Sequence, residues 1–231
     1  MIILAGDCHG DFREVLATVA GYSPDTIAGI FFLGDQTPNR PLEQELAPLG
    51  TQLLARTWFI LGNHDSDHPR FLRNHLGMWD HHLHNKVITV DGVRMGGVSG
   101  IFRKDIWYPP EKALWQDRTS LGKHELFEGQ LPLKHWTTIF PEDLAAPWEP
   151  MDILLTHEAP GSHAYGFDVL DHFARRRGVQ WIFHGHHHED SMGTLAPGIQ
   201  VVGLGLCQCM VWDPSMLTHA HAAVSRSGSV T

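Results

Sequence analysis

The chain contains only three cysteines in 231 residues, at Cys8, Cys207 and Cys209. This small, odd number cannot build a disulfide framework and is typical of proteins in a reducing compartment. The sequence also lacks an apolar run of the roughly 20 residues that a membrane-spanning helix needs, and no secretory signal is recognisable. We therefore expect a soluble, cytoplasmic protein with no membrane partner.

Basic residues are scarce as well. Lys and Arg total 17 against 26 Asp and Glu, which gives a formal net charge of −9. A general nucleic-acid binder needs a basic surface to follow the phosphates, so nucleic acid is not favoured as a partner. With 42% hydrophobic residues, the chain is expected to form a single domain over residues 1–231 with one insertion. Eighteen histidines are unusual, and histidine is the commonest metal ligand.

Five short apolar runs each end in aspartate, asparagine or histidine. One of them, Trp58-Phe59-Ile60-Leu61, runs into Gly62-Asn63-His64-Asp65. The others are residues 2–5 before Asp7 and His9, 30–33 before Asp35, 152–156 before His157, and 181–183 before the stretch His184 to His188. Open α/β sheets place their sites at the carboxyl ends of strands, so the pattern predicts one site built from five strand ends.

The order of the elements predicts a parallel sheet in the first third of the chain. We expect strands that end near residues 6, 34 and 63, with helices over residues 11–19 and 42–49 between them and a further helix over 69–76 after the third. Asp91-Gly92 between apolar segments predicts a β-hairpin. A helix at 167–177 should stop at Gly178. Strands at 199–204 and 206–211 are expected to be antiparallel, and residues 225–229 to form a frayed tail.

Residues 99–150 form an irregular insertion, for which only a helix at 110–116 is predicted. Long irregular connections in compact domains are usually functional or disordered, and the aromatic content of this one argues against disorder. We expect the insertion to form one wall of the substrate cleft. The alternative, that most of its aromatic side chains pack onto the core, stays open. These aromatics are Trp107, Tyr108, Trp115, Phe127 and Trp136.

The motifs at the strand ends resemble, in their order, those of the calcineurin-like metallophosphoesterases. They are Asp7-x-His9, Gly34-Asp35, Gly62-Asn63-His64-Asp65, His157 and Gly185-His186-x-His188. A single Asp or His after a strand is more often a turn or cap residue, but five segments in the family's order are strong evidence. The resemblance implies an α/β (α+β) fold with a central β-sandwich flanked by helices, and a two-metal phosphoester hydrolase.

The resemblance also implies which residues hold the metals. Asp7, His9, Asp35 and His188 would bind one ion, and Asp35, Asn63, His157 and His186 the other, so that Asp35 bridges them. A water or hydroxide between the ions would be the nucleophile, and His64 would be the general acid. Mn²⁺ is the expected ion, with Fe or Zn as alternatives, because mixed histidine and carboxylate ligands suit transition ions.

Several neighbouring residues receive a structural interpretation. On an extended segment His186 and His188 would face the site while His187 faces away, and neither His184 nor His187 is expected to be a ligand. Asp65 is interpreted as a loop-stabilising acceptor. Cys207 and Cys209 are interpreted as packing residues of a strand.

The substrate is less determined than the reaction. Asp35 is followed by Gln36 and not by the Asp-Arg-Gly of some phosphatases, which argues against the protein-phosphatase branch. Residues 94–103 and the segment around His157 show a local resemblance to the lariat-debranching nucleases. We expect a small phosphoester substrate, favour phosphodiesters over monoesters, and choose Arg103 as the phosphate-binding residue. A nuclease for short or branched nucleic acid and a non-catalytic metal-binding scaffold stay open as alternatives, although His64 favours an enzyme.

Overall fold

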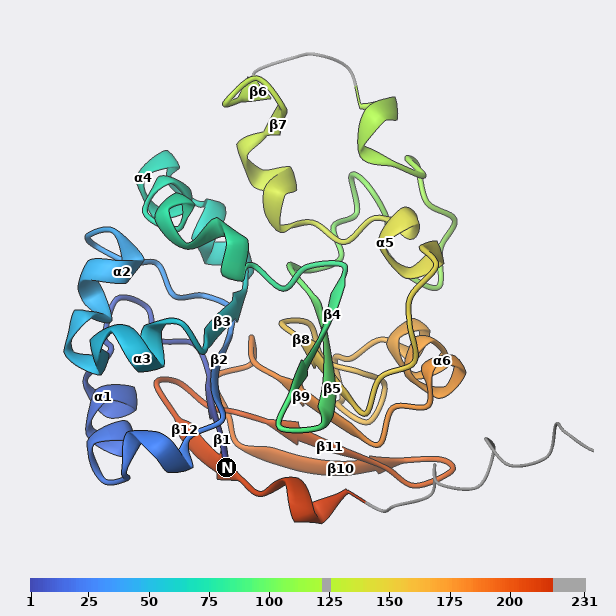
Figure 1. Ribbon diagram of the computed structural model, residues 1–231. Helices are drawn as coiled ribbons and strands as arrows, with labels where there is room; N and C mark the ends of the chain where they lie inside the picture. Colours follow the sequence, from blue (N-terminus) through green and yellow to red (C-terminus); the bar gives the residue numbers. More distant parts are fainter. Residues whose placement is uncertain (122–125, 218–231) are drawn as a thin grey trace, which may run out of the picture.

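The computed structural model describes residues 1–121 and 126–217, and it contains two β-sheets that face each other (Figure 1). The expected tail at 225–229 lies outside the described residues. The four-stranded sheet has the order β12 (Cys209–Trp212), β1 (Ile2–Ala5), β2 (Gly29–Leu33), β3 (Thr57–Ile60). The six-stranded sheet has the order β10 (Ser191–Leu195), β11 (Ile199–Gly203), β9 (Trp181–His184), β8 (Ile153–Thr156), β5 (Val93–Val98), β4 (Lys86–Val90).

Both sheets are mainly parallel, and the first has one antiparallel edge strand whereas the second has two. In the first sheet β1, β2 and β3 are parallel and β12 is antiparallel to β1. In the second, β11, β9, β8 and β5 are parallel, while β10 and β4 close the edges as antiparallel strands. The carboxyl ends of the parallel strands therefore lie at one end of each sheet, where sites are expected.

One of three hydrophobic core clusters among the described residues lies between the sheets. It combines Ile2, Leu4, Phe31, Leu33 and Ile60 from the first sheet with Met95, Ile153, Leu155, Phe183 and Val202 from the second. Helices α1 (Arg13–Ala20), α2 (Leu42–Glu45), α3 (Gly50–Leu54) and α4 (Pro69–Arg73) cover the outer face of the first sheet. Helices α5 (Pro141–Ala145) and α6 (Asp168–Arg177) pack on the outer face of the second. The expected sandwich flanked by helices is thus confirmed.

Several boundaries differ from the sequence prediction. The helix expected over 42–49 is two short pieces, α2 and a 3₁₀ turn at Ala47–Leu49, and α3 follows directly after them. Strand β10 was not predicted. Strand β12 belongs to the first sheet, and β11 runs parallel to β9, so the expected antiparallel relation of 199–204 and 206–211 is wrong.

The insertion is irregular, as expected, but its predicted helix at 110–116 is wrong. Leu114 N instead donates to Ile106 O, so the chain folds back on itself where Pro109 and Pro110 remove two backbone donors. The insertion contains the short hairpin of β6 (Leu126–Phe127) and β7 (Leu131–Pro132), 3₁₀ turns at Arg118–Ser120 and Leu133–Thr137, and α5.

The aromatic side chains of the insertion mostly pack inward. The rings of Trp107 and Phe102 meet edge to face at 5.1 Å, and Trp136 packs in the same way on Trp79 at 5.6 Å. The insertion reaches the strand ends through Thr137, whose Oγ1 is 2.5 Å from the Ser66 hydroxyl. No helix in the described part of the chain is long and apolar enough to cross a membrane.

Candidate metal centre

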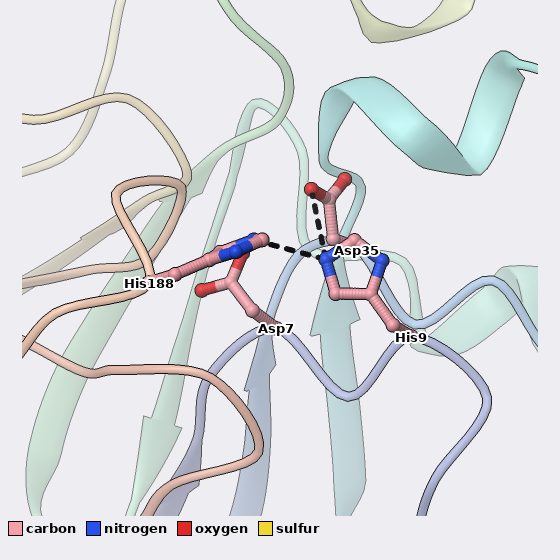
Figure 2. Close-up of side chains that lie close together, drawn as sticks. All are labelled: Asp7, His9, Asp35 and His188. Carbon is pink, nitrogen blue, oxygen red and sulfur yellow. Dashed lines mark hydrogen bonds and ion pairs between the residues drawn. The ribbon is translucent and has the colours of Figure 1, made fainter.

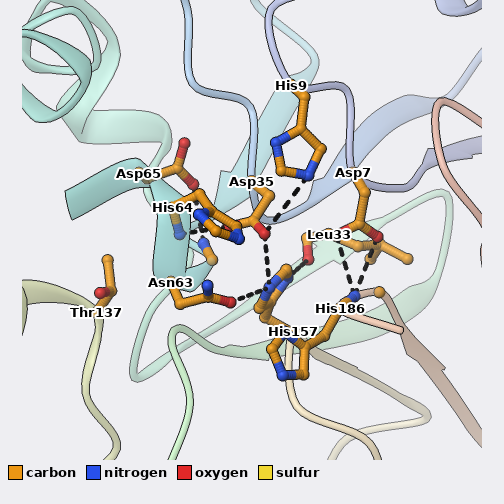
Figure 3. A network of polar contacts seen from close by, with 12 residues as sticks. Asp7, His9, Leu33, Asp35, Asn63, His64, Asp65, Thr137, His157 and His186 are labelled. Atoms are coloured by element: carbon orange, nitrogen blue, oxygen red, sulfur yellow. Dashed lines mark hydrogen bonds and ion pairs between the residues drawn. The ribbon is translucent and has the colours of Figure 1, made fainter. Parts of the chain in front are cut away.

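The seven side chains expected to bind metal all lie in turns that follow parallel strands. The loops after β1, β2 and β3 supply Asp7, His9, Asp35 and Asn63, and those after β8 and β9 supply His157, His186 and His188. Figure 3 shows side chains from both sheets converging on Asp35. The site therefore spans the junction between the two halves of the sandwich.

One group of four side chains surrounds a common point (Figure 2). Potential ligand atoms of Asp7, His9, Asp35 and His188 all lie within 4.8 Å of one another. His9 Nε2 is 3.0 Å from His188 Nε2 and 3.8 Å from Asp35 Oδ2, and His188 Nε2 is 3.7 Å from Asp7 Oδ1. Both carboxylates are buried, whereas the two histidines are partly exposed. This arrangement opens toward solvent on the histidine side.

A second group shares Asp35 with the first. Atoms of Asp35, His157 and His186 also lie within 4.8 Å of one another. His157 Nε2 is 3.3 Å from Asp35 Oδ2 and 3.1 Å from the Asn63 side-chain oxygen, so Asn63 joins this group. His157 Nδ1 bonds to the Leu33 carbonyl at 2.8 Å, which fixes the ring and leaves Nε2 facing the site.

The backbone at these residues is strained. Five of the seven have positive φ: Asp7 at 37°, His9 at 45°, Asp35 at 53°, His186 at 76° and His188 at 55°. Non-glycine residues rarely adopt this conformation, and it persists only where surrounding contacts impose it. The β1 and β2 loops are linked by His9 N donating to Asp35 O at 2.8 Å. Such strain at five converging positions indicates a functional site.

The chain from His186 to His188 is not extended, which corrects the sequence prediction. Both outer histidines have positive φ, so the segment turns at each of them. Their rings join the two groups, while the His187 ring stacks on His163 with centroids 3.9 Å apart. His187 belongs to neither group, although its ring centroid lies 4.9 Å from that of His186, and the turn sets its direction in place of strand alternation.

Two glycines allow the groups to approach so closely. A Cβ atom on Gly34 would lie 2.3 Å from His157 Nδ1, and one on Gly62 would lie 2.2 Å from Asp35 Oδ1. Neither contact is sterically possible, and both partners are buried groups of the site. Any larger residue at these positions would therefore displace a candidate ligand.

Charge within the site is strongly coupled. Burial raises the pKa of Asp7 to about 6, and the neighbouring Asp35 charge adds to this effect. Burial would also raise the pKa of Asp35, but His157 holds it well below its usual range. Burial would lower the pKa of His157, yet Asp35 raises it to about 10. One protonated histidine thus partly neutralises two buried carboxylates, a role that a cation can take over.

The donor set fits divalent ions. Asp35 Oδ2 is buried and has no hydrogen-bond partner among the described residues, although it points toward both histidine groups. Its other oxygen accepts from the His64 backbone N–H at 2.8 Å. A buried carboxylate oxygen needs a partner, and an ion bound by the surrounding nitrogens and oxygens would provide one.

His64 lies beside these groups and belongs to neither. Its Nδ1 is 2.5 Å from Asp67 Oδ2, and its ring centroid is 5.2 Å from that of His9. The sequence analysis missed Asp67, although its position three residues after His64 on a polar turn could have suggested the pair. It also missed Glu158, a buried carboxylate whose Oε1 is 4.0 Å from His186 Nε2 and whose Oε2 accepts from Phe102 N.

The remaining candidates lie outside the two groups. Asp65 accepts hydrogen bonds from Gly62 N at 2.8 Å and Thr37 N at 2.7 Å, as expected of a loop-stabilising acceptor. Arg40, the first arginine after Asp35, pairs with Glu45 and was not chosen as a candidate. Arg103 is half-buried and donates from Nε to Thr138 Oγ1 at 3.1 Å. Burial lowers the pKa of Arg103, and Asp35 is among the acidic residues that oppose this effect.

A sandwich with two histidine–aspartate groups at its strand ends is the arrangement expected of a metal-dependent hydrolase. The model of the calcineurin-like phosphoesterase family matches residues 1–190, and the chain belongs to this family. It is therefore a phosphoric ester hydrolase, and the family implies a dinuclear divalent metal site. An uncharacterized protein of Haemophilus influenzae is 34% identical over 197 residues, which cover 82% of this chain and 84% of that protein.

Solved structures share the fold. The protein TT1561 of Thermus thermophilus superimposes with a TM-score of 0.57 at 19% identity and covers 89% of both chains. A dimetal phosphatase from Danio rerio gives a TM-score of 0.54 at 12% identity, covering 89% of this chain and 87% of its own. At these identities the likeness extends to the fold alone.

Proposed function

We propose that the chain hydrolyses phosphoesters at two divalent ions bridged by Asp35. The observation that carries the proposal is the Asp35 carboxylate, which is buried, belongs to both groups, and has one oxygen without a hydrogen-bond partner in the described chain. Asp7, His9 and His188 would complete one ligand set, and Asn63, His157 and His186 the other. Two bound divalent ions supply a hydroxide nucleophile at neutral pH and stabilise the phosphoryl charge.

His64 is proposed as the proton donor to the leaving oxygen. Asp67 occupies its Nδ1, which leaves Nε2 as the available ring nitrogen. The bond from His64 N to Asp35 fixes the residue relative to the bridging carboxylate. A histidine fixed at both backbone and ring is suited to general acid catalysis.

Arg103 is proposed to bind a phosphate oxygen, and phosphodiesters are proposed as the preferred substrates. Arg103 is supported by Thr138, and the adjacent Thr137 contacts Ser66 on the turn that carries Asn63. Arg103→Ala is expected to lower kcat/KM about tenfold or more, because a charge-assisted contact to phosphate is lost. Arg40→Ala, which breaks only the pair with Glu45, is the matched control. Equal activities of the two variants would show that Arg103 does not bind the substrate phosphate.

Small substrates are favoured over nucleic acid. Among the arginines of the insertion, Arg118 is engaged with Asp143 at 2.6 Å and with Glu142 at 2.9 Å. It is therefore not available to follow a phosphate backbone. The three free cysteines support the proposed cytoplasmic location. The shared core between the sheets supports a single domain.

The central test is hydrolysis by metal-loaded protein. We expect Mn²⁺ to support the highest activity, with Fe or Zn as the alternatives, because the ligands combine imidazole with carboxylate. The substrates would be p-nitrophenyl phosphate, bis-p-nitrophenyl phosphate, cyclic nucleotides and short oligonucleotides, each with and without EDTA. The diester should be preferred and the oligonucleotides should be poor substrates. Absence of metal-dependent hydrolysis across the whole panel would overturn the proposal.

A further inference from the structure

A series of aromatic rings leads from the metal centre to the surface. The centroids of His157 and His186 lie 5.0 Å apart, and those of His186 and His187 lie 4.9 Å apart. His187 then stacks on His163 at 3.9 Å and 19°. Tyr165 lies at the outer end, 6.1 Å from His187 and 5.9 Å from His163, and is 76% exposed. A large aromatic side chain is thus presented to solvent two rings beyond a candidate metal ligand.

The loop that carries this tyrosine is held firmly. Gly161 N donates to Asp171 Oδ1 at 2.8 Å, and Phe167 N donates to Ala159 O at 2.9 Å, so both ends are tied. Within the loop, Gly166 N donates to His163 O at 3.0 Å. A loop with these bonds offers a fixed surface, which lowers the entropic cost of binding.

The His163 ring cannot turn without breaking two bonds. Its Nδ1 accepts from Tyr165 N at 3.2 Å, which leaves the proton on Nε2, and Nε2 donates to Glu189 Oε1 at 3.0 Å. The ring plane is therefore set, and it holds the stacked His187 ring in the same orientation. Together, His163, Tyr165 and His187 form what we call the ring shelf.

Most aromatics of the insertion do not offer an equivalent surface. Trp115 is 39% exposed, but it lies outside the series of rings that begins at His157 and His186. Trp107 and Trp136 are packed against other rings. Tyr108 is partly exposed, but Lys104 Nζ lies 5.3 Å from its ring centroid and covers one face. Among the described residues, no cation lies over Tyr165, which leaves its outer face accessible.

We propose that the ring shelf binds a planar aromatic substituent of the phosphoester, such as a nucleobase or an aryl group. The proposal rests on the proposed function, because the phosphate must be held at the metal centre for its substituent to reach the shelf. Aromatic rings stack on planar groups of this kind with little dependence on their identity. The shelf would hold the substituent that remains on the phosphate after the leaving group departs. It would therefore select diesters in which that remaining substituent is aromatic over those in which it is a small alkyl group.

The test compares two diesters with the same leaving group, methyl p-nitrophenyl phosphate and phenyl p-nitrophenyl phosphate, with the Mn²⁺-loaded protein. Tyr165→Ala should raise KM for the phenyl ester about tenfold, with little change in kcat and no change for the methyl ester. Tyr165→Phe keeps the ring and should behave as the unmodified chain. Tyr22→Ala removes another exposed tyrosine, just beyond α1, and is the control. Equal KM changes on both esters, or none, would overturn the proposal.

Binding without turnover separates this proposal from the proposed function. Phenylphosphonate and methylphosphonate would be titrated into the metal-loaded protein by calorimetry. The unmodified chain should prefer the phenyl compound, and Tyr165→Ala should remove the preference. If the unmodified chain prefers phenylphosphonate but hydrolyses no ester, the aromatic-binding role of the ring shelf is supported and the proposed catalytic function is rejected. No preference in the unmodified chain would reject the shelf.

Discussion

His64 Nδ1 and Asp67 Oδ2 lie 2.5 Å apart within a single 3₁₀ turn, Asn63–Ser66, and the residue that follows it. Both side chains are substantially exposed, so the pair contributes little to stability. Its effect is to fix which ring nitrogen of His64 is available. The carboxylate thus acts on the chemistry of the histidine more than on the fold.

His64→Ala should therefore lower kcat without loss of metal. A positioned proton donor contributes about 10²–10⁴ in rate, so a decrease of that size is expected for poor leaving groups. Esters of p-nitrophenol need less protonation and should be affected less. Asp67→Asn should give a smaller loss with the same dependence on leaving group. An equal decrease on good and poor leaving groups would argue against the general-acid role.

Asp35→Ala should remove most of the bound metal and abolish activity, because one carboxylate serves both groups. The variant would be measured by elemental analysis after dialysis. Asp11→Ala is the control, since Asp11 lies on the neighbouring loop and pairs only with the exposed Arg13 among the described residues. Two ions per chain in the Asp35 variant would disprove the bridging assignment.

The three consecutive histidines should respond differently to substitution. Alanine at His186 or His188 should weaken metal binding about 10-fold or more, since each removes a nitrogen from a metal group. Alanine at His187 should leave metal affinity within a few-fold, because that ring stacks on His163. Calorimetric titration with Mn²⁺ measures all three. Strong metal loss in the His187 variant would show that the assignment of ligands among these three histidines is wrong.

Metal binding should release a proton. Burial would lower the pKa of His157, but Asp35 raises it to about 10, so the metal-free protein carries this proton at neutral pH. Apparent metal affinity should then rise about tenfold per pH unit while the proton is displaced. Calorimetry in two buffers of different ionisation enthalpy counts the protons. Identical observed enthalpies in both buffers would contradict the expectation.

The raised pKa of His157 also determines whether the stability of the metal-free protein rises or falls with pH. The folded pKa of His157 lies above its ordinary value of 6.5. Its contribution to the stability of the metal-free protein is therefore fully present below pH 6.5 and is lost as the pH rises toward 10. Urea unfolding of EDTA-treated protein across this range measures the change.

Arg118→Met should destabilise the fold by about 2–4 kcal/mol, because it removes the two hydrogen bonds that Arg118 donates to the buried Asp143 carboxylate. The comparison is Arg13→Met, which breaks an exposed pair with Asp11 and should cost less than about 1 kcal/mol. Denaturant midpoints of the two variants give the difference. Similar midpoints would mean that Arg118 does not anchor the insertion.

The ion pair of Arg118 and Asp143 also determines how the stability of the fold changes at acid pH. Burial would raise the pKa of Asp143, but His84 and Arg118 hold it well below its ordinary value of 3.8. This stabilisation is present above pH 3.8 and is lost as the pH falls below it. The unmodified chain should therefore lose more stability than the Arg118 variant between pH 5 and pH 2.

The sequence predicted the strand ends well because burial of parallel strands produces continuous apolar runs. The run 58–61 and the polar residues after it are an example, and the structure places Asn63 and His64 beside Asp35. Contacts between segments far apart in the chain could not be predicted from local sequence patterns. Strand β12 pairs with β1 although about two hundred residues separate them, and nothing local to Cys209 indicates that partner.

Backbone strain was the second feature that could not be predicted from the sequence. The segment 186–188 was expected to be extended, and the structure gives positive φ at both outer histidines. Local propensity disfavours this conformation for histidine, so only the surrounding contacts impose it. His186 N, for example, donates to Asp7 Oδ2 at 3.0 Å, across 179 positions of sequence.

The pairing of β1 with β12 has a consequence for synthesis on the ribosome. The outer edge of β1 is unprotected until residues 209–212 emerge, which takes on the order of ten to forty seconds at usual elongation rates. An unpaired strand edge invites association with other chains during that interval. The proposed ligand His188 is synthesised only shortly before β12, so metal held at the proposed site could not stabilise the nascent N-terminal sheet early. Until then, this edge can be covered only by factors that bind the chain as it leaves the ribosomal exit tunnel. A slow stretch of translation before residue 209 should therefore increase aggregation.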